Sequence, residues 1–263
     1  MPSESDKTWE QYGAADPYFG VLTDPKFRSS QLNASAKSEF FRTGSEHINH
    51  VLDEVRRRVA PGFEPRRALD FGCGVGRLVL PLSELCTEVV GVDISPSMLA
   101  EARRNAEEFG AANATFVASD DGLTEVPGTF DFVHSYIVLQ HVPIERGLVL
   151  LTRMLDLLEP GGVGALHLTY ATTLPRRTLL LRQIRRRIPL VHRALLALRG
   201  HPRNSPIMQM NLYPLNTVTR LVQERAGAST VTFEFTKHGP FLGAIMYFQK
   251  PSAHASPSDL PIG

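Results

Sequence analysis

The sequence predicts an α/β fold, a doubly wound and mostly parallel sheet of seven strands with an antiparallel last strand. Segments with strand character alternate with segments of helical periodicity, and this alternation requires right-handed crossovers between parallel strands. The last two strands are joined only by Lys237-His238-Gly239-Pro240. That connection is too short for a crossover, so the final pair must be an antiparallel hairpin.

The elements follow in a regular order. Apolar residues at helical spacing predict a helix from Glu39 to Val59, which Pro61-Gly62 ends. Strands are predicted at 68–71, 88–93, 114–119, 130–136, 163–170, 230–236 and 244–250. Helices are predicted at 75–85, 96–109, 143–158 and 217–226. Ser95 followed by Pro96 is a typical helix start, a capping residue before proline at the first helical position.

Composition places the chain among ordinary globular proteins. It has 263 residues, 43% hydrophobic and 21% charged, which suits one large α/β domain. A net charge of +1 provides no general attraction to nucleic acid. Cys73 and Cys86 are too few for a disulfide framework, and neither a signal peptide nor an apolar run of membrane-spanning length is present. We therefore expect a cytoplasmic protein.

A glycine-rich turn follows the first predicted strand and reads Asp70-Phe71-Gly72-Cys73-Gly74-Val75-Gly76. Glycines let a ligand approach the backbone, and the next helix offers unpaired N–H groups. Asp93, at the tip of the second strand, can accept hydrogen bonds from both hydroxyls of a ribose. Asp70 suits a cationic ammonium group and would repel a pyrophosphate. The pattern predicts a nucleoside site and argues against a dinucleotide.

These residues resemble the first motif of class I S-adenosylmethionine-dependent methyltransferases of the bacterial small-molecule type, and Val90 to Leu99 resembles the second. The resemblance extends over residues 66–170 and, weakly, over the final hairpin. It implies that S-adenosylmethionine is the cofactor. The cofactor-binding residues expected from it are Asp70, Gly72, Cys73, Gly74, Gly76, Asp93, Ile94, Met98, Asp120, Asp121, Gly122 and Tyr136.

Roles within this set follow from the resemblance. An acidic residue after the third strand accepts from the adenine amino group in that family. Asp120 is preferred by position and Asp121 is second, with turn-forming aspartates as the alternative. Ile94 and Met98 are expected to flank the adenine. Tyr136 is expected to line the sulfonium.

The segment after the fourth strand is where an acceptor is expected, because ligands of open α/β sheets bind beyond the carboxyl ends of the strands. His141 is the candidate general base, since imidazole can take a proton near pH 7. A structural or substrate-orienting histidine is the alternative. Gln140 and Tyr170 are the candidate substrate-binding residues. His134, inside the strand, is expected to be buried structure.

Two absences narrow the chemistry. The fourth strand does not end in an Asp/Asn-Pro-Pro-Tyr run, which argues against methylation of adenine or glutamine nitrogens. Neither a magnesium-holding acidic set nor zinc-ligand spacing is evident, so no metal is expected. The predicted activity is methyl transfer to a small-molecule hydroxyl, on a sugar or secondary metabolite. The alternatives are an RNA- or protein-directed methyltransferase, a non-catalytic cofactor-binding protein and a nicotinamide oxidoreductase.

The predicted domain organisation has a helical N-terminal segment at 1–60, the cofactor-binding domain at 61–250 and a flexible tail at 251–263. The N-terminal segment either covers the active site or packs on the sheet. A helical insertion after the fifth strand, at about 172–214, holds nine arginines and no acidic residue between Arg176 and Arg203. This basic lid could grip an anionic acceptor, touch an anionic membrane surface, contact RNA phosphates or simply cap the site. Nucleic acid is not the expected partner.

Overall fold

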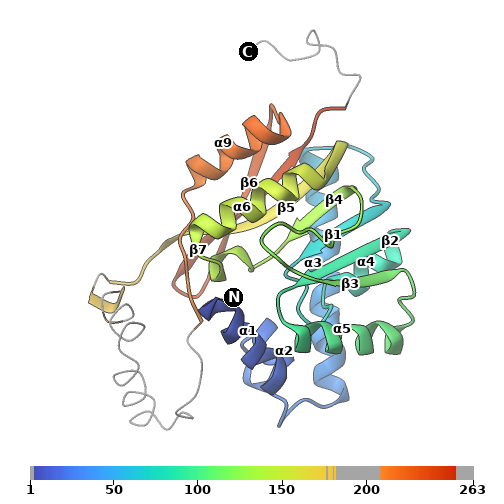
Figure 1. Cartoon of the computed structure of the whole chain (residues 1–263), viewed down its shortest axis with the longest axis vertical. Coiled ribbons are helices and arrows are strands. Elements are labelled where there is room, and N and C mark those ends of the chain that lie inside the picture. The colour runs from blue at the N-terminus through green and yellow to red at the C-terminus, as the bar shows by residue number, and fades with distance from the viewer. Residues whose placement is uncertain (1–2, 176, 180, 182–207, 253–263) are drawn as a thin grey trace.

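The computed structural model describes residues 3–175, 177–179, 181 and 208–252 (Figure 1). Its centre is a seven-stranded sheet in the order β3-β2-β1-β4-β5-β7-β6. The strands are β1 (Arg67–Phe71), β2 (Glu88–Asp93), β3 (Ala114–Ala118), β4 (Phe130–Ser135), β5 (Leu158–Thr172), β6 (Val231–His238) and β7 (Phe241–Gln249). The first five strands run parallel, and β7 lies antiparallel between β5 and β6. The predicted fold class is confirmed.

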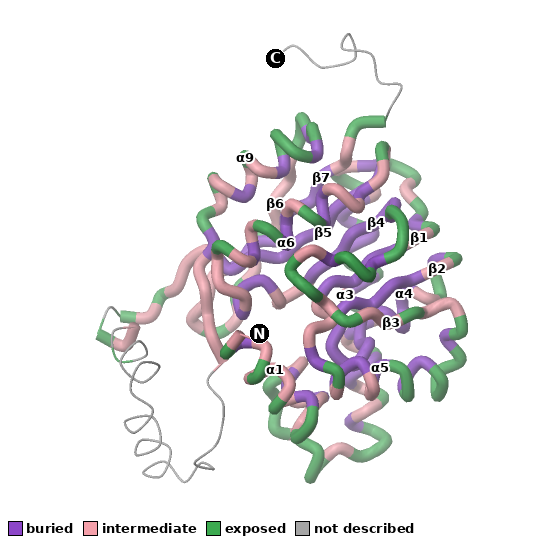
Figure 2. Tube along the Cα trace, in the orientation of Figure 1, coloured by how far each residue is buried: buried purple, intermediate pink, exposed green. Residues whose placement is uncertain are grey.

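Helices cover both faces of the sheet (Figure 1). The α-helices are α1 (Glu4–Ala15), α2 (Pro17–Val21), α3 (Ala34–Arg58), α4 (Val79–Leu85), α5 (Pro96–Phe109), α6 (Ile144–Leu157) and α9 (Leu215–Ala226). Short 3₁₀ helices are η1 (Pro25–Phe27) and η2 (Leu139–His141). The α6 and α9 helices pack on one face, and α3 and α4 pack on the other. Figure 2 shows that the buried residues concentrate in the central strands and the inward helix faces.

Several boundaries differ from the predicted ones for local reasons. The α3 helix begins at Ala34 because the Asn33 side chain accepts from the Ala36 N–H (2.9 Å) and caps it. The α4 helix begins at Val79 and not at 75, since Gly74 and Gly76 have positive φ angles (53° and 85°) that keep this stretch in a turn. Ser95 does cap α5 by accepting from the Met98 N–H (3.1 Å), as predicted.

The N-terminal segment is held on the carboxyl side of the sheet, beside α5. Glu10 of α1 accepts from the hydroxyls of Ser95 (2.7 Å) and Ser97 (2.5 Å) at the start of α5. Tyr18 of α2 donates to Glu101 farther along the same helix (2.7 Å). These contacts join the first two helices to the element that follows Asp93. The N-terminal segment is therefore part of the same packed unit as the sheet.

Most of the predicted basic lid, residues 182–207, and nearly all of the predicted tail lie outside the described residues. The described start of the insertion is helical at 177–179. Of the helices that the structure describes, none has the length and apolar character needed to cross a membrane.

Candidate functional site

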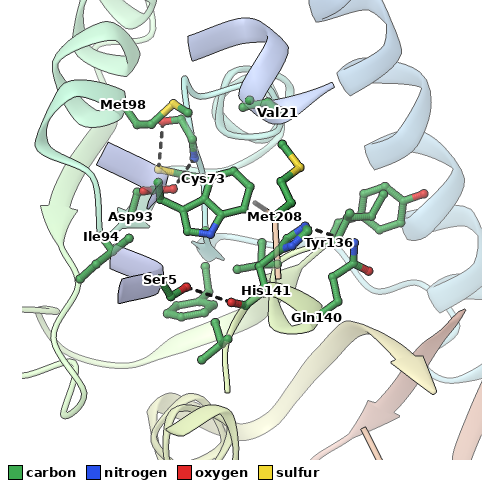
Figure 3. Close-up of a pocket in the computed structure, with 18 of the residues that line it drawn as sticks. Ser5, Val21, Cys73, Asp93, Ile94, Met98, Tyr136, Gln140, His141 and Met208 are labelled. Carbon is green, nitrogen blue, oxygen red and sulfur yellow. Dashed lines mark hydrogen bonds between the residues drawn. The ribbon is translucent and has the colours of Figure 1, made fainter. Parts of the chain in front are cut away.

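A cavity of about 620 Å³ opens at the carboxyl ends of β1, β2 and β4. This is the edge of an open α/β sheet where ligands bind, and the volume lies in the usual range for small-molecule sites. The α1 helix, η2 and the β6–β7 turn complete its walls. Figure 3 shows Asp93, Ile94 and Met98 on one side of the cavity and Tyr136 and Gln140 on the other.

The glycine turn forms the floor between these sides. Gly72 has a φ of 77°, and a Cβ there would lie 2.3 Å from Val138 Cγ2. A Cβ on Gly74 would lie 2.7 Å from Val21 Cγ2. Cys73 lines the cavity between them, and burial together with nearby carboxylates raises the pKa of its thiol. The turn is therefore a close-packed, uncharged backbone surface.

Asp93 is fixed by the backbone around it. Its Oδ2 accepts from the Gly74 N–H and its Oδ1 accepts from the Ser95 N–H, both at 2.9 Å. Burial raises the pKa of this carboxyl, although the backbone N–H groups work in the opposite direction. Each carboxylate oxygen can accept more than one hydrogen bond, so Asp93 is held in place and still able to bind hydroxyls.

Asp70 is oriented by two histidines. The His134 Nδ1–H donates to Asp70 Oδ1 (2.9 Å), and the Nε2 atoms of His134 and His47 are 3.2 Å apart. One of these two Nε2 atoms donates to the other, and the tautomers of the two rings decide which one. Burial is the main cause that lowers the pKa of His47, which keeps it neutral. Asp70 Oδ2 remains buried with no hydrogen-bond partner among the described residues.

Arg77 is a site residue that the sequence interpretation missed. Its side chain lines the cavity, and the residue is only 5% exposed. One Nη1–H donates to Thr43 Oγ1 (3.3 Å), whereas Nε has no partner in the described parts of the chain. No described carboxylate forms an ion pair with it, and burial lowers its pKa. A charged residue directly after the last glycine of the turn was the available signal.

His141 has both ring nitrogens engaged. The Nδ1–H of His141 donates to the Gln209 carbonyl oxygen (2.7 Å). The Nε2 of His141 accepts from the Gln140 amide N–H, with the two nitrogens 3.2 Å apart. Gln140 Oε1 in turn accepts from the Thr169 hydroxyl. Burial lowers the pKa of His141 to about 4, although the bond to Gln209 opposes this. The imidazole is therefore neutral at pH 7 and fixed in one tautomer.

The α1 helix forms one wall, which the sequence interpretation did not resolve to residues. Ser5 donates from its hydroxyl to the His141 carbonyl oxygen (3.0 Å). Trp9 packs edge-on against the His141 ring, with ring centroids 4.9 Å apart. Asp6 pairs with Arg146 (2.5 Å), and both residues line the cavity. The periodicity of this short polar helix is too weak to indicate a binding role.

Five predicted site residues are not brought to the cavity: Gly76, Asp120, Asp121, Gly122 and Tyr170. Asp120 accepts from the N–H groups of Gly122 and Thr124 (both 3.0 Å), so its carboxylate closes its own turn. Asp121 pairs with Arg146 (2.5 Å) from the surface. The neighbouring Ser119 lines the cavity instead. The adenine contact expected of Asp120 has no support in this geometry.

Local packing accounts for the other two. Gly76 provides a left-handed turn residue beneath the cavity floor, with a φ of 85°. Tyr170 stands on β5 beside Phe235, with ring centroids 5.9 Å apart. The other predicted residues, Asp70, Gly72, Cys73, Gly74, Asp93, Ile94, Met98, Tyr136, Gln140 and His141, do line the cavity. Within the described residues, no three histidine, cysteine or acidic side chains are grouped as metal ligands.

Residues 68–162 match the methyltransferase domain family. A ubiquinone biosynthesis O-methyltransferase of Cereibacter sphaeroides is 37% identical over 101 residues, 38% of this chain and 40% of that protein. The corresponding enzyme of Methylocella silvestris is 37% identical over 122 residues, 46% of this chain and 45% of that protein. The matches thus span less than half the length of these curated relatives.

Solved structures share the fold over nearly the whole chain. The magnesium protoporphyrin IX methyltransferase of Synechocystis, with bound S-adenosylhomocysteine, has a TM-score of 0.60 at 21% identity and covers 93% of this chain and 97% of its own. The N-methyltransferase NodS of Bradyrhizobium japonicum has a TM-score of 0.59 at 14% identity, covering 95% and 100%. At such identities the similarity establishes the fold.

Proposed function

We propose that this chain, whose residues 68–162 are a class I S-adenosylmethionine-dependent methyltransferase domain, transfers a methyl group from S-adenosylmethionine to a hydroxyl of a small molecule. The acceptor is a sugar or a secondary metabolite in this proposal. The proposed location is the cytoplasm. The observation that carries the proposal is the meeting of Asp93, Asp70 and Arg77 in one cavity.

The three charged residues fit the two ends of the cofactor. Asp93, already fixed by Gly74 and Ser95, would accept from the ribose hydroxyls, while Ile94 and Met98 would flank the adenine. Asp70 Oδ2 and Arg77 Nε are two of the five buried side-chain polar atoms that lack a hydrogen-bond partner among the described residues. A carboxylate and a guanidinium suit the ammonium and carboxylate of an amino acid. Bound there, the cofactor would supply an electrophilic methyl group on a sulfonium.

The same charges argue against a nicotinamide dinucleotide. Asp70 lies at the floor of the cavity and is buried, so its charge is poorly screened from a pyrophosphate seated on the glycine turn. An RNA- or protein-directed activity would use the basic insertion, which lies largely outside the described residues. A membrane contact and an anionic acceptor would depend on the same arginines. The small-molecule proposal rests on the described cavity.

His141 remains the sequence-based candidate for the general base. To take a proton on Nε2 it must first release the Gln140 amide. If it is the base, we expect His141→Ala to lower turnover by a factor of about 10² or more. Affinity for S-adenosylhomocysteine would stay nearly unchanged. Equal losses of turnover and affinity would instead indicate a structural histidine.

Calorimetry and a methyl-transfer screen test the proposed function. The purified chain should bind S-adenosylhomocysteine and not NAD. With labelled S-adenosylmethionine, it should methylate at least one member of a panel of hydroxyl and amine acceptors that includes phosphorylated sugars. Binding of NAD alone would overturn the proposal. Binding of S-adenosylhomocysteine without transfer to any acceptor would favour a non-catalytic cofactor-binding protein.

A further inference from the structure

The β6–β7 turn brings a second histidine to the cavity. His238, Gly239, Pro240 and Phe241 all line it, together with Tyr136 at the end of β4. None of these four turn residues is assigned to the cofactor. The sequence indicated only that His238 belongs to the short connection of the final hairpin. The hairpin therefore contributes a wall to the same site that the glycine turn begins.

His238 has a ring nitrogen without a partner. Its Nε2 is buried and has no hydrogen bond within the described ranges of the chain. His167 lies beside it, with ring centroids 5.5 Å apart, and His167 Nε2 is 2.9 Å from the Thr236 hydroxyl. The Tyr136 ring contacts both imidazoles, at centroid distances of 5.1 and 6.1 Å. A buried polar atom left unpaired is costly, which points to a ligand that pairs with it.

The surrounding wall is apolar. Met208, Met210, Pro240 and Phe241 line the cavity in addition to Tyr136. Thioethers and aromatic rings favour an apolar body, especially a ring.

The charged residues that line the cavity each have a partner or a role in cofactor binding. Asp6 and Arg146 pair with each other, and Asp93 is held by the backbone. Asp70 and Arg77 are assigned to the cofactor above. In the part of the lining that the structure describes, no cation is left over for a phosphorylated acceptor. The acceptor side of the cavity therefore suits an uncharged molecule.

We propose that the acceptor is a hydroxyl on an uncharged, apolar body, and that His238 Nε2 accepts the hydroxyl proton. This inference rests on the proposed methyltransferase function. In the step, the acceptor oxygen forms a bond to the methyl carbon as the carbon–sulfur bond breaks, with its electron pair passing to sulfur. The hydroxyl proton moves to His238. The products are a methyl ether, a neutral thioether and an imidazolium.

A general base needs a ring nitrogen that is free to accept a proton, and His238 has one whereas His141 does not. Both nitrogens of His141 are engaged by Gln140 and Gln209, whereas Nε2 of His238 has no described partner. Burial lowers the pKa of His238, which keeps the imidazole neutral. In the tautomer with the proton on Nδ1, the Nε2 lone pair is available to a hydroxyl.

The test uses the full chain saturated with S-adenosylhomocysteine and two uncharged probes, phenol and cyclohexanol. Glucose 6-phosphate is the anionic comparison. Histidine-ring ¹⁵N NMR should show a change at His238 Nε2 when phenol or cyclohexanol is added, and the responding probe separates an aromatic from an aliphatic acceptor. His238→Phe should weaken binding of that probe by about tenfold or more, since phenylalanine keeps a ring in the cavity wall but has no accepting atom.

Matched variants separate this inference from the function beneath it. His238→Phe should leave S-adenosylhomocysteine affinity within about twofold, and Lys237→Ala, an exposed neighbour in the same turn, should change neither affinity. No response of His238 to either uncharged probe, or binding of glucose 6-phosphate alone, would overturn the inference. Unchanged probe binding in His238→Phe would also overturn it. Failure of the wild-type chain to bind S-adenosylhomocysteine would remove the proposed function itself, and this inference with it.

Discussion

The two halves of the cavity are built in different ways. The cofactor half comes mainly from one stretch of chain, residues 70–98, and its Asp93 carboxylate is held by the backbone N–H groups of Gly74 and Ser95. The acceptor half is assembled from residues 136–141, 208–210 and 238–241, which are far apart in the sequence. In the cofactor half, neighbouring residues determine most of the geometry. In the acceptor half, the lining residues come together only because β5, β6 and β7 pair in the sheet.

Their electrostatics differ as well. The cofactor half contains two carboxyl groups and a guanidinium, those of Asp70, Asp93 and Arg77. The acceptor half is lined by two imidazoles that burial keeps neutral, those of His141 and His238, and His167 packs beside His238. A zwitterionic ligand and an uncharged one would each find a matching half. A change of pH should affect mainly the acceptor half, and substitutions at Asp93 and Glu10 should have smaller effects on the cofactor half.

The largest effect is expected in the acceptor half, on lowering the pH. Burial lowers the pKa of His141 to about 4 and that of His167 to about 3, whereas an unfolded histidine titrates near 6.5. As the pH falls below about 6.5, the unfolded state binds protons that the folded state excludes. The free energy of unfolding should therefore fall by about 1.4 kcal/mol per pH unit for each of these histidines.

Urea unfolding at pH 7 and pH 5 measures this loss. The stability is fully present above pH 6.5 and disappears as the pH approaches the folded pKa values. His141→Gln should reduce the dependence, because it removes one of the two histidines that burial keeps neutral. A free energy of unfolding that is constant between pH 7 and pH 5 would mean that these imidazoles are not held neutral.

A smaller effect is expected in the cofactor half. Asp93→Ala should weaken S-adenosylhomocysteine binding by about tenfold or more, since a hydrogen bond to a charged group contributes ~1.5–3 kcal/mol. Asp120→Ala is the matched control, because that carboxylate closes its own turn with Gly122 and Thr124. Calorimetry of both variants is decisive. Equal losses of affinity in the two variants would support the predicted contact of Asp120 with the adenine.

The smallest effect is expected from the helix that covers the cofactor half. Glu10→Gln should weaken S-adenosylhomocysteine binding by about threefold, because the neutral amide holds Ser95 and Ser97 less strongly. Although burial opposes it, hydrogen bonding to these two serines lowers the pKa of Glu10, so the charged form is the one that binds them. Glu4→Gln on the exposed side of α1 is the control. Identical affinities of the two variants would show that α1 does not support the cofactor half.

Prediction from sequence succeeded where neighbouring residues determine the structure. The Ser95 cap and the alternation of strands and helices were readable for this reason, and so was the placement of Asp93 beside the glycine turn. Arg77 was missed because its role depends on being buried against α3 without an acidic partner among the described residues. The adenine contact of Asp120 stays a prediction, because the sequence cannot distinguish a carboxylate that binds a ligand from one that closes a turn, and the structure shows this carboxylate closing its turn.

The sequence by itself determined the sheet, its antiparallel ending, the glycine turn and the place of Asp93 beside it, because strand periodicity, glycine conformation and helix capping act over a few residues. Only the tertiary structure decided that His47 and His134 orient Asp70, that α1 walls the cavity and that His238 faces it. These contacts join residues between 64 and more than 130 positions apart. Their formation depends on strand order and helix packing, which local patterns do not encode residue by residue.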